Sequence, residues 1–252
     1  MEPLTNETYW EKHFENASSI NRNLEKQFAD FLPFFDSLPA FSRKKMEQIF
    51  EVGCFPGRYL HFLSQRFGAV ANGIDFVRDF SPMTDFFKSS GTPVGALIQG
   101  DFFKTEPSNK FDLVLSIGFI EHFPDPTEVL KRQSAWVSDG GLMMVTVPNK
   151  RFLRIPFAFL FDQKNQKAHV LKSMRISYFK HVAQEMGWEL LECAYVGGFN
   201  PKVHQPLNAV QSVVYRPLKW AIKKLNPWLK KKPSKWYSHT LLAVYRLPVS
   251  NS

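Results

Sequence analysis

Short apolar segments alternate with helix-length segments along the first part of this chain, and this order constrains the fold more than any other feature. The segments that are typical of strands are residues 48–52, 71–75, 94–99, 111–117 and 142–147. Helical patterns lie between them, for example at residues 59–67 and 126–137. Regular alternation of strands and helices predicts a parallel sheet that is covered by helices on both faces.

Two later strands extend this pattern. A helical segment at residues 176–186 ends at Gly187, and it is followed by strand-like residues 188–196 and 240–245. Two late strands after five alternating ones fit an antiparallel hairpin at one end of the sheet. We therefore expect an α/β fold: a Rossmann-like, doubly wound seven-stranded sheet, mostly parallel with an antiparallel last strand, and helices on both faces.

The remaining segments divide the chain. Residues 7–36 show helical spacing of apolar side chains, and Pro33 and Pro39 mark the expected exit of this helix. We expect residues 1–45 to form a helical lid, to which Trp10 and His13 belong. Residues 46–199 and 238–248 form the expected core, and residues 200–237 form a basic, aromatic insertion.

Small and acidic residues stand at the carboxyl ends of the first four strands. The first strand runs into Glu51-Val-Gly53-Cys-Phe-Pro-Gly57, the second ends at Asp75, the third leads to Asp101, and the fourth runs into Ser116-Ile-Gly-Phe-Ile-Glu-His122. In open α/β sheets, ligands bind outside the carboxyl ends of the strands. Glycine lets the backbone approach a ligand closely, and a carboxylate after the second strand can accept both hydroxyl protons of a ribose.

This set of four strand ends resembles the class I S-adenosylmethionine-dependent methyltransferases, in particular the small-molecule group called type 11 or type 12. The resemblance covers residues 46–150 well and residues 165–198 loosely. It implies that the glycine turn lies under the methionine part of the cofactor, that Asp75 binds the ribose and that Asp101 accepts from the adenine amine. The implied cofactor contacts are Glu51, Gly53, Gly57, Asp75, Phe76, Asp101, Phe102, Ser116, Ile117 and Gly118.

The turn departs from the family pattern at one place. Phe55 stands where the family usually has its middle glycine. Its side chain is expected either to point away from the cofactor or to narrow the pocket.

Two histidines are the candidate catalytic residues. Glu121-His122 matches the "EH" pair that the family often has after the fourth strand, and His169 lies in a segment that in related enzymes faces the substrate. Neutral histidine can act as a general base near pH 7, although methyl transfer does not require one. Ordinary backbone contacts explain His122 as well, and a surface loop explains His169. No group of His, Asp and Cys has metal-ligand spacing, so we expect no metal.

The cysteines and the lengths of the apolar segments indicate the cellular compartment. Cys54 and Cys193 are far apart and form no CxxC pair, so a reducing cytosol is the default. No stretch reaches the roughly 18 apolar residues of a spanning helix. We therefore expect a cytoplasmic protein, with association to a membrane surface left open.

The net charge of +9 is placed unevenly. No Asp or Glu follows Glu192, whereas ten Lys or Arg residues do, most of them within residues 216–235. Three interpretations of this segment stay open: an added helix with solvated lysines, an interfacial helix on an anionic membrane, or a nucleic-acid contact. Pro217 suits the first position of this helix, and Pro227 is expected to kink or end it.

The function that these patterns favour is methyl transfer to oxygen, nitrogen or carbon of a small-molecule or lipid-linked acceptor. Two alternatives remain at this point: an RNA methyltransferase, and a non-catalytic protein of methyltransferase type, which Phe55 keeps open.

Overall fold

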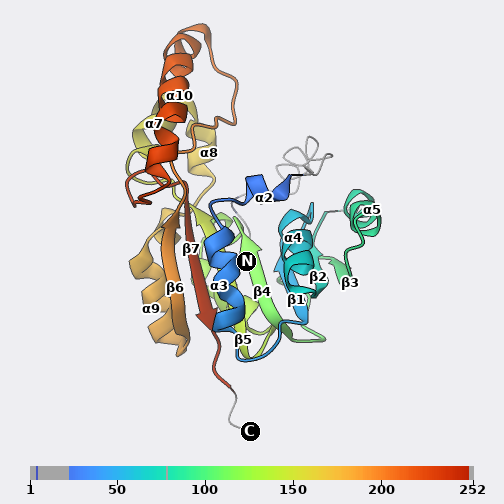
Figure 1. Cartoon of the computed structure of the whole chain (residues 1–252). Coiled ribbons are helices and arrows are strands. Elements are labelled where there is room, and N and C mark those ends of the chain that lie inside the picture. Colours follow the sequence, from blue (N-terminus) through green and yellow to red (C-terminus); the bar gives the residue numbers. More distant parts are fainter. Residues whose placement is uncertain (1–3, 5–22, 78, 250–252) are drawn as a thin grey trace.

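A single seven-stranded sheet organises the molecule (Figure 1). The computed structural model describes residue 4, residues 23–77 and residues 79–249. The strand order is β3-β2-β1-β4-β5-β7-β6. β1 pairs in parallel with β2 and β4, whereas β7 runs antiparallel to both β5 and β6. The expected fold class, including the antiparallel last strand, is confirmed.

The strands lie close to the positions that the sequence predicts. Their bounds are β1 Gln48–Val52, β2 Val70–Asp75, β3 Val94–Gln99, β4 Phe111–Ile117, β5 Val137–Pro148, β6 Glu189–Val196 and β7 Thr240–Arg246. β5 begins five residues earlier than the apolar run, because Val137 already pairs with Phe111 of β4 before the Gly140-Gly141 irregularity.

Helices cover both faces of the sheet. Their bounds are α2 Leu24–Gln27, α3 Leu32–Phe41, α4 Arg58–Phe67, α5 Ser81–Ser89, α6 Pro126–Ser134, α7 Arg154–Phe161, α8 Gln163–Lys167, α9 Ile176–Met186 and α10 Ala209–Leu229. None of these helices is both long and apolar enough to cross a membrane.

Side chains of alternate strand residues build two separate cores. In β1, Phe50 belongs to the core under α6 and α9, and Ile49 belongs to the core under α3 and α4. Both side chains are fully buried. This is the period-2 alternation expected of a strand that is covered on both faces.

The N-terminal segment differs from its prediction. Pro33 stands in the first turn of α3 and Pro39 lies inside that helix, so the prolines do not end it. Phe35 and Leu38 are fully buried in the core that α4 completes, which makes α3 part of the sheet's cover. Trp10 and His13 lie outside the described residues.

The helix of the basic segment also differs. Pro217 does not begin it: α10 begins at Ala209, where the Asn208 side chain accepts from the Gln211 amide and the Gln211 side chain accepts from the Asn208 amide, a capping box. Pro227 lies inside α10 as well and does not end it. The expected start at Pro217 was therefore wrong.

Helices α7, α8 and α10 project beyond the end of the sheet (Figure 1). We call these helices, with residues 200–208 and 230–237, the projecting unit. It has a small apolar core of its own around Phe157, Phe161 and Phe199, which Tyr215 and Ile222 of α10 contact. Every residue of α10 is described and none is buried, so the helix is held on one side only.

Asp30 ties this unit to the rest of the chain. Its carboxylate lies 2.8 Å from the Lys230 ammonium and 3.5 Å from Nε2 of His239. The contact with His239 and, despite burial, that with Lys230 lower the pKa of Asp30. The segment between α2 and α3 therefore meets the end of α10 and the start of β7 at one residue.

Candidate active site

A cavity of about 830 Å³ lies at the carboxyl ends of the parallel strands. Residues that follow β1, β2, β3, β4 and β5 line it. Phe199 and, from the projecting unit, Arg154, Asn200 and His204 also belong to its wall. The edge where a doubly wound sheet binds its ligands is thus hollow in this protein.

The turn that follows β1 forms part of the cavity wall. Gly53 and Gly57 have positive φ, 73° and 87°, and a Cβ on Gly57 would lie only 2.6 Å from the Phe87 ring. Glycine is therefore required at position 57 by both conformation and packing. Glu51 is 4 % exposed, and its Oε2 has no hydrogen-bond partner in the described part of the chain. Burial, and then the Asp75 carboxylate, raise the pKa of Glu51 well above its usual value.

Asp75 is held in place by backbone donors. Its carboxylate accepts from the amides of Phe55 and Val77, at 3.0 and 3.1 Å, and it is 6 % exposed. Burial raises the pKa of Asp75, against the opposing effect of these donors. A carboxylate has about four acceptor positions, so acceptor capacity remains on Asp75 for a hydroxyl group of a ligand.

Phe55 is one of the residues that line the cavity. Its ring lies 6.5 Å from that of Phe80, and it packs against the core under α3 and α4. The Phe55 amide donates a hydrogen bond to the Asp75 carboxylate, and any residue other than proline could provide this donor.

Most of the other residues that are expected to contact the cofactor lie at the ends of β3 and β4. Asp101, Phe102, Ile117 and Gly118 all line the cavity, as does Phe76. Asp101 is exposed and accepts from the Phe103 amide, and its carboxylate lies 3.5 Å from Lys104.

Ser116 does not belong to this set. Its side chain is fully buried and its hydroxyl donates to the Gln133 side chain at 3.3 Å, away from the cavity. The strand's alternation explains this, because Ile117 takes the position that lines the cavity.

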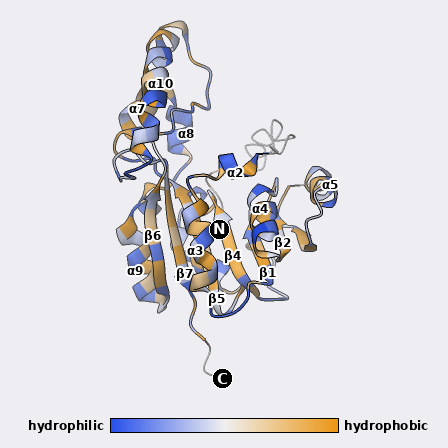
Figure 2. Ribbon diagram, in the orientation of Figure 1, coloured by the Kyte–Doolittle hydropathy of each residue, from blue (hydrophilic) through white to orange (hydrophobic). Residues whose placement is uncertain are grey.

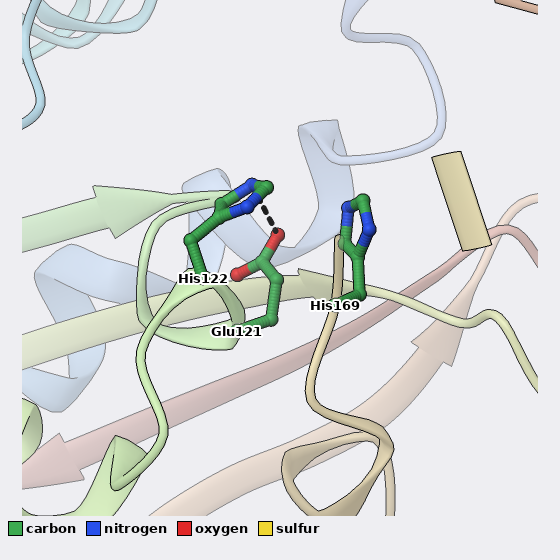
Figure 3. A group of neighbouring side chains, drawn as sticks. All are labelled: Glu121, His122 and His169. Atoms are coloured by element: carbon green, nitrogen blue, oxygen red, sulfur yellow. Dashed lines mark ion pairs between the residues drawn. The ribbon is translucent and has the colours of Figure 1, made fainter. Parts of the chain in front are cut away.

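Both candidate histidines meet at the cavity with Glu121 (Figure 3). The His122 and His169 rings have centroids 4.6 Å apart, and Nε2 of His122 lies 3.9 Å from the Glu121 carboxylate. Nδ1 of His122 contacts the Ala168 carbonyl at 3.1 Å, and Nδ1 of His169 contacts the Asn165 carbonyl at 2.7 Å. A carbonyl only accepts, so Nδ1 of each ring carries the proton and each Nε2 is the acceptor atom when the ring is neutral.

Burial dominates the proton affinities in this group. It lowers the pKa of His169 to about 2, with help from Lys150 and His122, and it raises the pKa of Glu121 to about 8. His169 therefore stays neutral at every physiological pH. It can accept a hydrogen bond but is too weak a base to hold a proton.

The linear spacing of the sequence did not reveal this group. The candidate ligand atoms of Glu121, His122 and His169 lie within 4.8 Å of one another, a set that could hold a metal ion. The Lys150 ammonium is close enough to lower the pKa of both His169 and Glu121. A positive charge at this distance opposes a divalent cation.

Lys150, Arg154 and His204 are among the polar residues of the cavity wall that were not predicted. Lys150 follows β5, Arg154 begins α7, and His204 lies in the 200–208 segment. The Arg154 guanidinium lies 2.7 Å from the buried Asp162 carboxylate, which also accepts from the His204 amide at 2.9 Å. Lys150 directly follows the fifth strand, so its place at the carboxyl edge was the available signal.

Comparison with known proteins decides the family. A family model described as a methyltransferase domain matches residues 20–193. The chain belongs to this family. Together with the strand order and the strand-end residues, the match makes it a class I methyltransferase whose cofactor is S-adenosylmethionine. That cofactor carries an ammonium group and ribose hydroxyls. The Glu51 Oε2 atom, which has no hydrogen-bond partner among the described residues, fits the ammonium, and the remaining acceptor capacity of Asp75 fits the hydroxyls.

Curated relatives of this methyltransferase match over a shorter range. A ubiquinone biosynthesis O-methyltransferase of Coxiella burnetii is 23 % identical over 109 residues, 43 % of this chain and 46 % of the relative. A trans-aconitate 2-methyltransferase of Rhizobium etli is 22 % identical over 117 residues, 46 % of this chain and 44 % of the relative. The match thus spans about half the length of these curated relatives.

Solved structures share the fold of the methyltransferase. The plantazolicin methyltransferase BpumL in complex with SAH has a TM-score of 0.60 at 12 % identity, over 97 % of this chain and 92 % of that one. A SAM-dependent methyltransferase from Archaeoglobus fulgidus has a TM-score of 0.54 at 18 % identity, over 96 % of this chain and all of the other.

Proposed function

We propose that this methyltransferase moves a methyl group from S-adenosylmethionine to an oxygen, nitrogen or carbon nucleophile of a small-molecule or lipid-linked acceptor. The observation that carries the proposal is the meeting of four strand ends around one cavity, with Glu51, Asp75 and Asp101 on one side and the histidines on the other. The curated relatives, named for ubiquinone biosynthesis and for trans-aconitate, support a small-molecule acceptor.

The bound donor would supply a methyl group on a sulfonium, and the acceptor's lone pair forms the new bond to carbon while the carbon–sulfur electron pair stays on sulfur. The chain's own residues hold the two partners in line, which can supply much of the rate. His169 accepts a hydrogen bond from the acceptor at Nε2 and so directs its lone pair. The low pKa of His169 leaves proton removal to His122 or water.

Among the described residues, Leu4 supports the lid expected within residues 1–45. Its amide donates to the His122 carbonyl at 2.7 Å, which places Leu4 beside the candidate catalytic residues. Because α3 packs into the core, we restrict the lid to residues before that helix, and we keep residues 200–237 as an insertion into the core of residues 46–199 and 238–248.

Calorimetry with S-adenosylhomocysteine tests the proposal. Asp75→Ala removes the acceptor of two ribose hydrogen bonds and is expected to weaken binding by about 1.5–3 kcal/mol, roughly ten- to a hundredfold. Asp85→Ala, an exposed acid of α5, is the matched control and should bind as the wild type. A folded chain that binds no S-adenosylhomocysteine would exclude the proposal. Binding with no turnover on any acceptor would favour the non-catalytic alternative.

We further propose that the projecting unit binds an anionic membrane surface, which suits a lipid-linked acceptor. In the described part of the chain, 12 of the 15 exposed large hydrophobic residues lie between residues 153 and 236, among them Phe159, Trp220 and Trp228. Along the α10 ribbon, hydrophilic and more hydrophobic residues are mixed (Figure 2). Leu218, Leu225 and Trp228 follow one another at helical spacing on α10, beside the row that contacts α7. Exposed tryptophan next to lysine is typical of interfacial helices.

Sedimentation with lipid vesicles tests this surface. Lys223→Gln with Lys224→Gln should weaken binding to vesicles that mix phosphatidylserine with phosphatidylcholine by about 2 kcal/mol, since each basic residue near such a surface contributes about 1 kcal/mol. Lys180→Gln, an exposed lysine of α9, is the control. Equal binding of the double variant, or salt-dependent RNA binding without vesicle binding, would contradict the proposal, and the second outcome would favour an RNA acceptor.

A further inference from the structure

Lys150 is a buried cation at the wall of the cavity. It follows the carboxyl end of β5, lines the cavity and is 7 % exposed. Its backbone is fixed, because its amide donates to Sδ of Met174 at 3.2 Å and its carbonyl accepts from Gln166 at 2.8 Å. Among the described residues no carboxylate lies within 4.0 Å of the Lys150 ammonium. A buried charge without a counter-ion is costly, so its presence here calls for a partner that arrives with a ligand.

The neighbouring groups do not neutralise Lys150. Arg154 and Asp162 form a pair of their own, 2.7 Å apart. Glu121, whose pKa is raised to about 8, is mostly neutral at pH 7. Burial, and then the Arg154 charge, lower the pKa of Lys150 to about 8, which leaves it mostly protonated at pH 7. Two basic side chains, Lys150 and Arg154, therefore share the one ionised carboxylate of Asp162 at this end of the cavity.

The position of Lys150 in the sheet separates it from the expected cofactor contacts. Those contacts come from the ends of β1, β2, β3 and β4, whereas β5 lies on the far side of β4 from β1. His169, which faces the acceptor in the proposed function, is near enough to Lys150 for the ammonium to lower its pKa. Lys150 thus lies with the acceptor's end of the cavity.

We propose that Lys150 binds an anionic group of the methyl acceptor, a carboxylate or a phosphate. This inference rests on the proposed function and names its substrate class. The anion pairs with the ammonium by a charge-assisted hydrogen bond, and the acceptor's nucleophilic atom is then directed toward His122 and His169. The Arg154 guanidinium, already paired with Asp162, adds positive potential without being the primary partner.

Four variants isolate the charge. Lys150→Gln and Lys150→Met both remove it and keep a side chain of similar length, so that one remains for the test if the other fails to fold. Lys150→Arg keeps the charge. Lys180→Gln removes an exposed lysine of α9 that does not line the cavity.

Calorimetric titrations with citrate and with inorganic phosphate, on the full chain saturated with S-adenosylhomocysteine, test the proposal. We expect at least one of these anions to bind wild type, Lys150→Arg and Lys180→Gln alike, and to bind Lys150→Gln and Lys150→Met at least about tenfold more weakly. Citrate binding points to a carboxylate in the acceptor and phosphate binding to a phosphate. Equal binding to the wild type and the charge-removing variants, or no binding of either anion to the wild type, overturns the proposal.

S-adenosylhomocysteine binding alone distinguishes this proposal from the one on which it rests. Its affinity should be the same in the wild type and in Lys150→Gln. A loss of affinity in Lys150→Gln would assign the ammonium to the methyl donor and overturn the inference, while leaving the proposed function intact. Absence of S-adenosylhomocysteine binding to the wild type would overturn the proposed function.

Discussion

The sheet and the projecting unit use apolar side chains in opposite ways. Each central strand buries nearly all of its residues between two layers of helices, and β4 has six buried residues in seven. α10 has 21 residues and buries none. The apolar residues of the sheet are packed against helices, whereas much of the apolar surface of α10 has no partner among the described residues. We infer that the buried sheet residues contribute most of the free energy of unfolding, and that the exposed apolar side chains of the projecting unit are available to contact a partner.

Core truncation gives the largest expected difference between the two regions. Phe179→Ala, in the core under α9, should lower the free energy of unfolding by about 3–5 kcal/mol. Trp228→Ala on α10, with a side chain 60 % exposed, should change it by less than about 0.5 kcal/mol. Urea unfolding followed by circular dichroism measures both. Similar losses in the two variants would contradict the comparison.

The next largest effect on stability is expected at the Arg154–Asp162 pair, because Asp162 also accepts from the His204 amide and so joins α7 to residues 200–208. Asp162→Ala leaves the part-buried Arg154 guanidinium without its counter-ion, although its bonds to the Asn200 and Lys202 carbonyls remain. This loss should cost about 3 kcal/mol and open residues 200–208 first. Hydrogen exchange of the His204 amide, which donates to Asp162, reports this opening. Lys164→Ala, an exposed neighbour in α8, is the control. Unchanged exchange in Asp162→Ala would show that the apolar core of the unit is sufficient.

The same pair has a defined pH dependence. Burial alone would raise the pKa of Asp162, but hydrogen bonds from His204 and Asn165 outweigh it and lower that pKa to about 2. A lowered folded-state pKa gives stability that is fully present above the unfolded value of about 4 and is lost as the pH falls toward 2. Acid should therefore release residues 200–208, and Asp162→Asn should not show that step.

Cofactor affinity should depend weakly on pH through Glu51. Its carboxyl is protonated more easily than usual when the cavity is empty, and the cofactor's ammonium favours the ionised form. Affinity for S-adenosylhomocysteine should therefore rise with pH, accompanied by proton release. Calorimetry in buffers of different ionisation enthalpy measures that release. Glu51→Gln should bind more weakly and without this proton linkage, and an unchanged linkage in the variant would contradict the assignment.

Chelation should have the smallest effect. The Lys150 ammonium beside Glu121, His122 and His169 opposes a divalent cation, so methyl transfer should be unchanged by EDTA. Loss of activity on chelation, restored by a divalent metal, would show instead that the three side chains hold an ion.

Short-range patterns predicted the sheet well and the site in part. Strand positions follow from apolar runs and turns, and Asp75 and Gly57 are recognisable because their roles depend on local geometry. Pro39 and Pro217 misled the prediction of helix boundaries, because both lie inside helices of the structure. Ser116 was misplaced by one step of strand alternation. The partners of Asp162 and the isolation of Lys150 depend on contacts between distant segments, which no spacing in the sequence encodes.

Asp30 gives the two regions a mechanical connection. It binds Lys230 at the end of α10 and His239 at the start of β7, and Gln27 and Phe31 on either side of it line the cavity. A shift of α10 against the sheet must strain or break this carboxylate's contacts. Force applied to the projecting unit would thus reach the wall of the cavity through the Asp30 side chain as well as through the backbone.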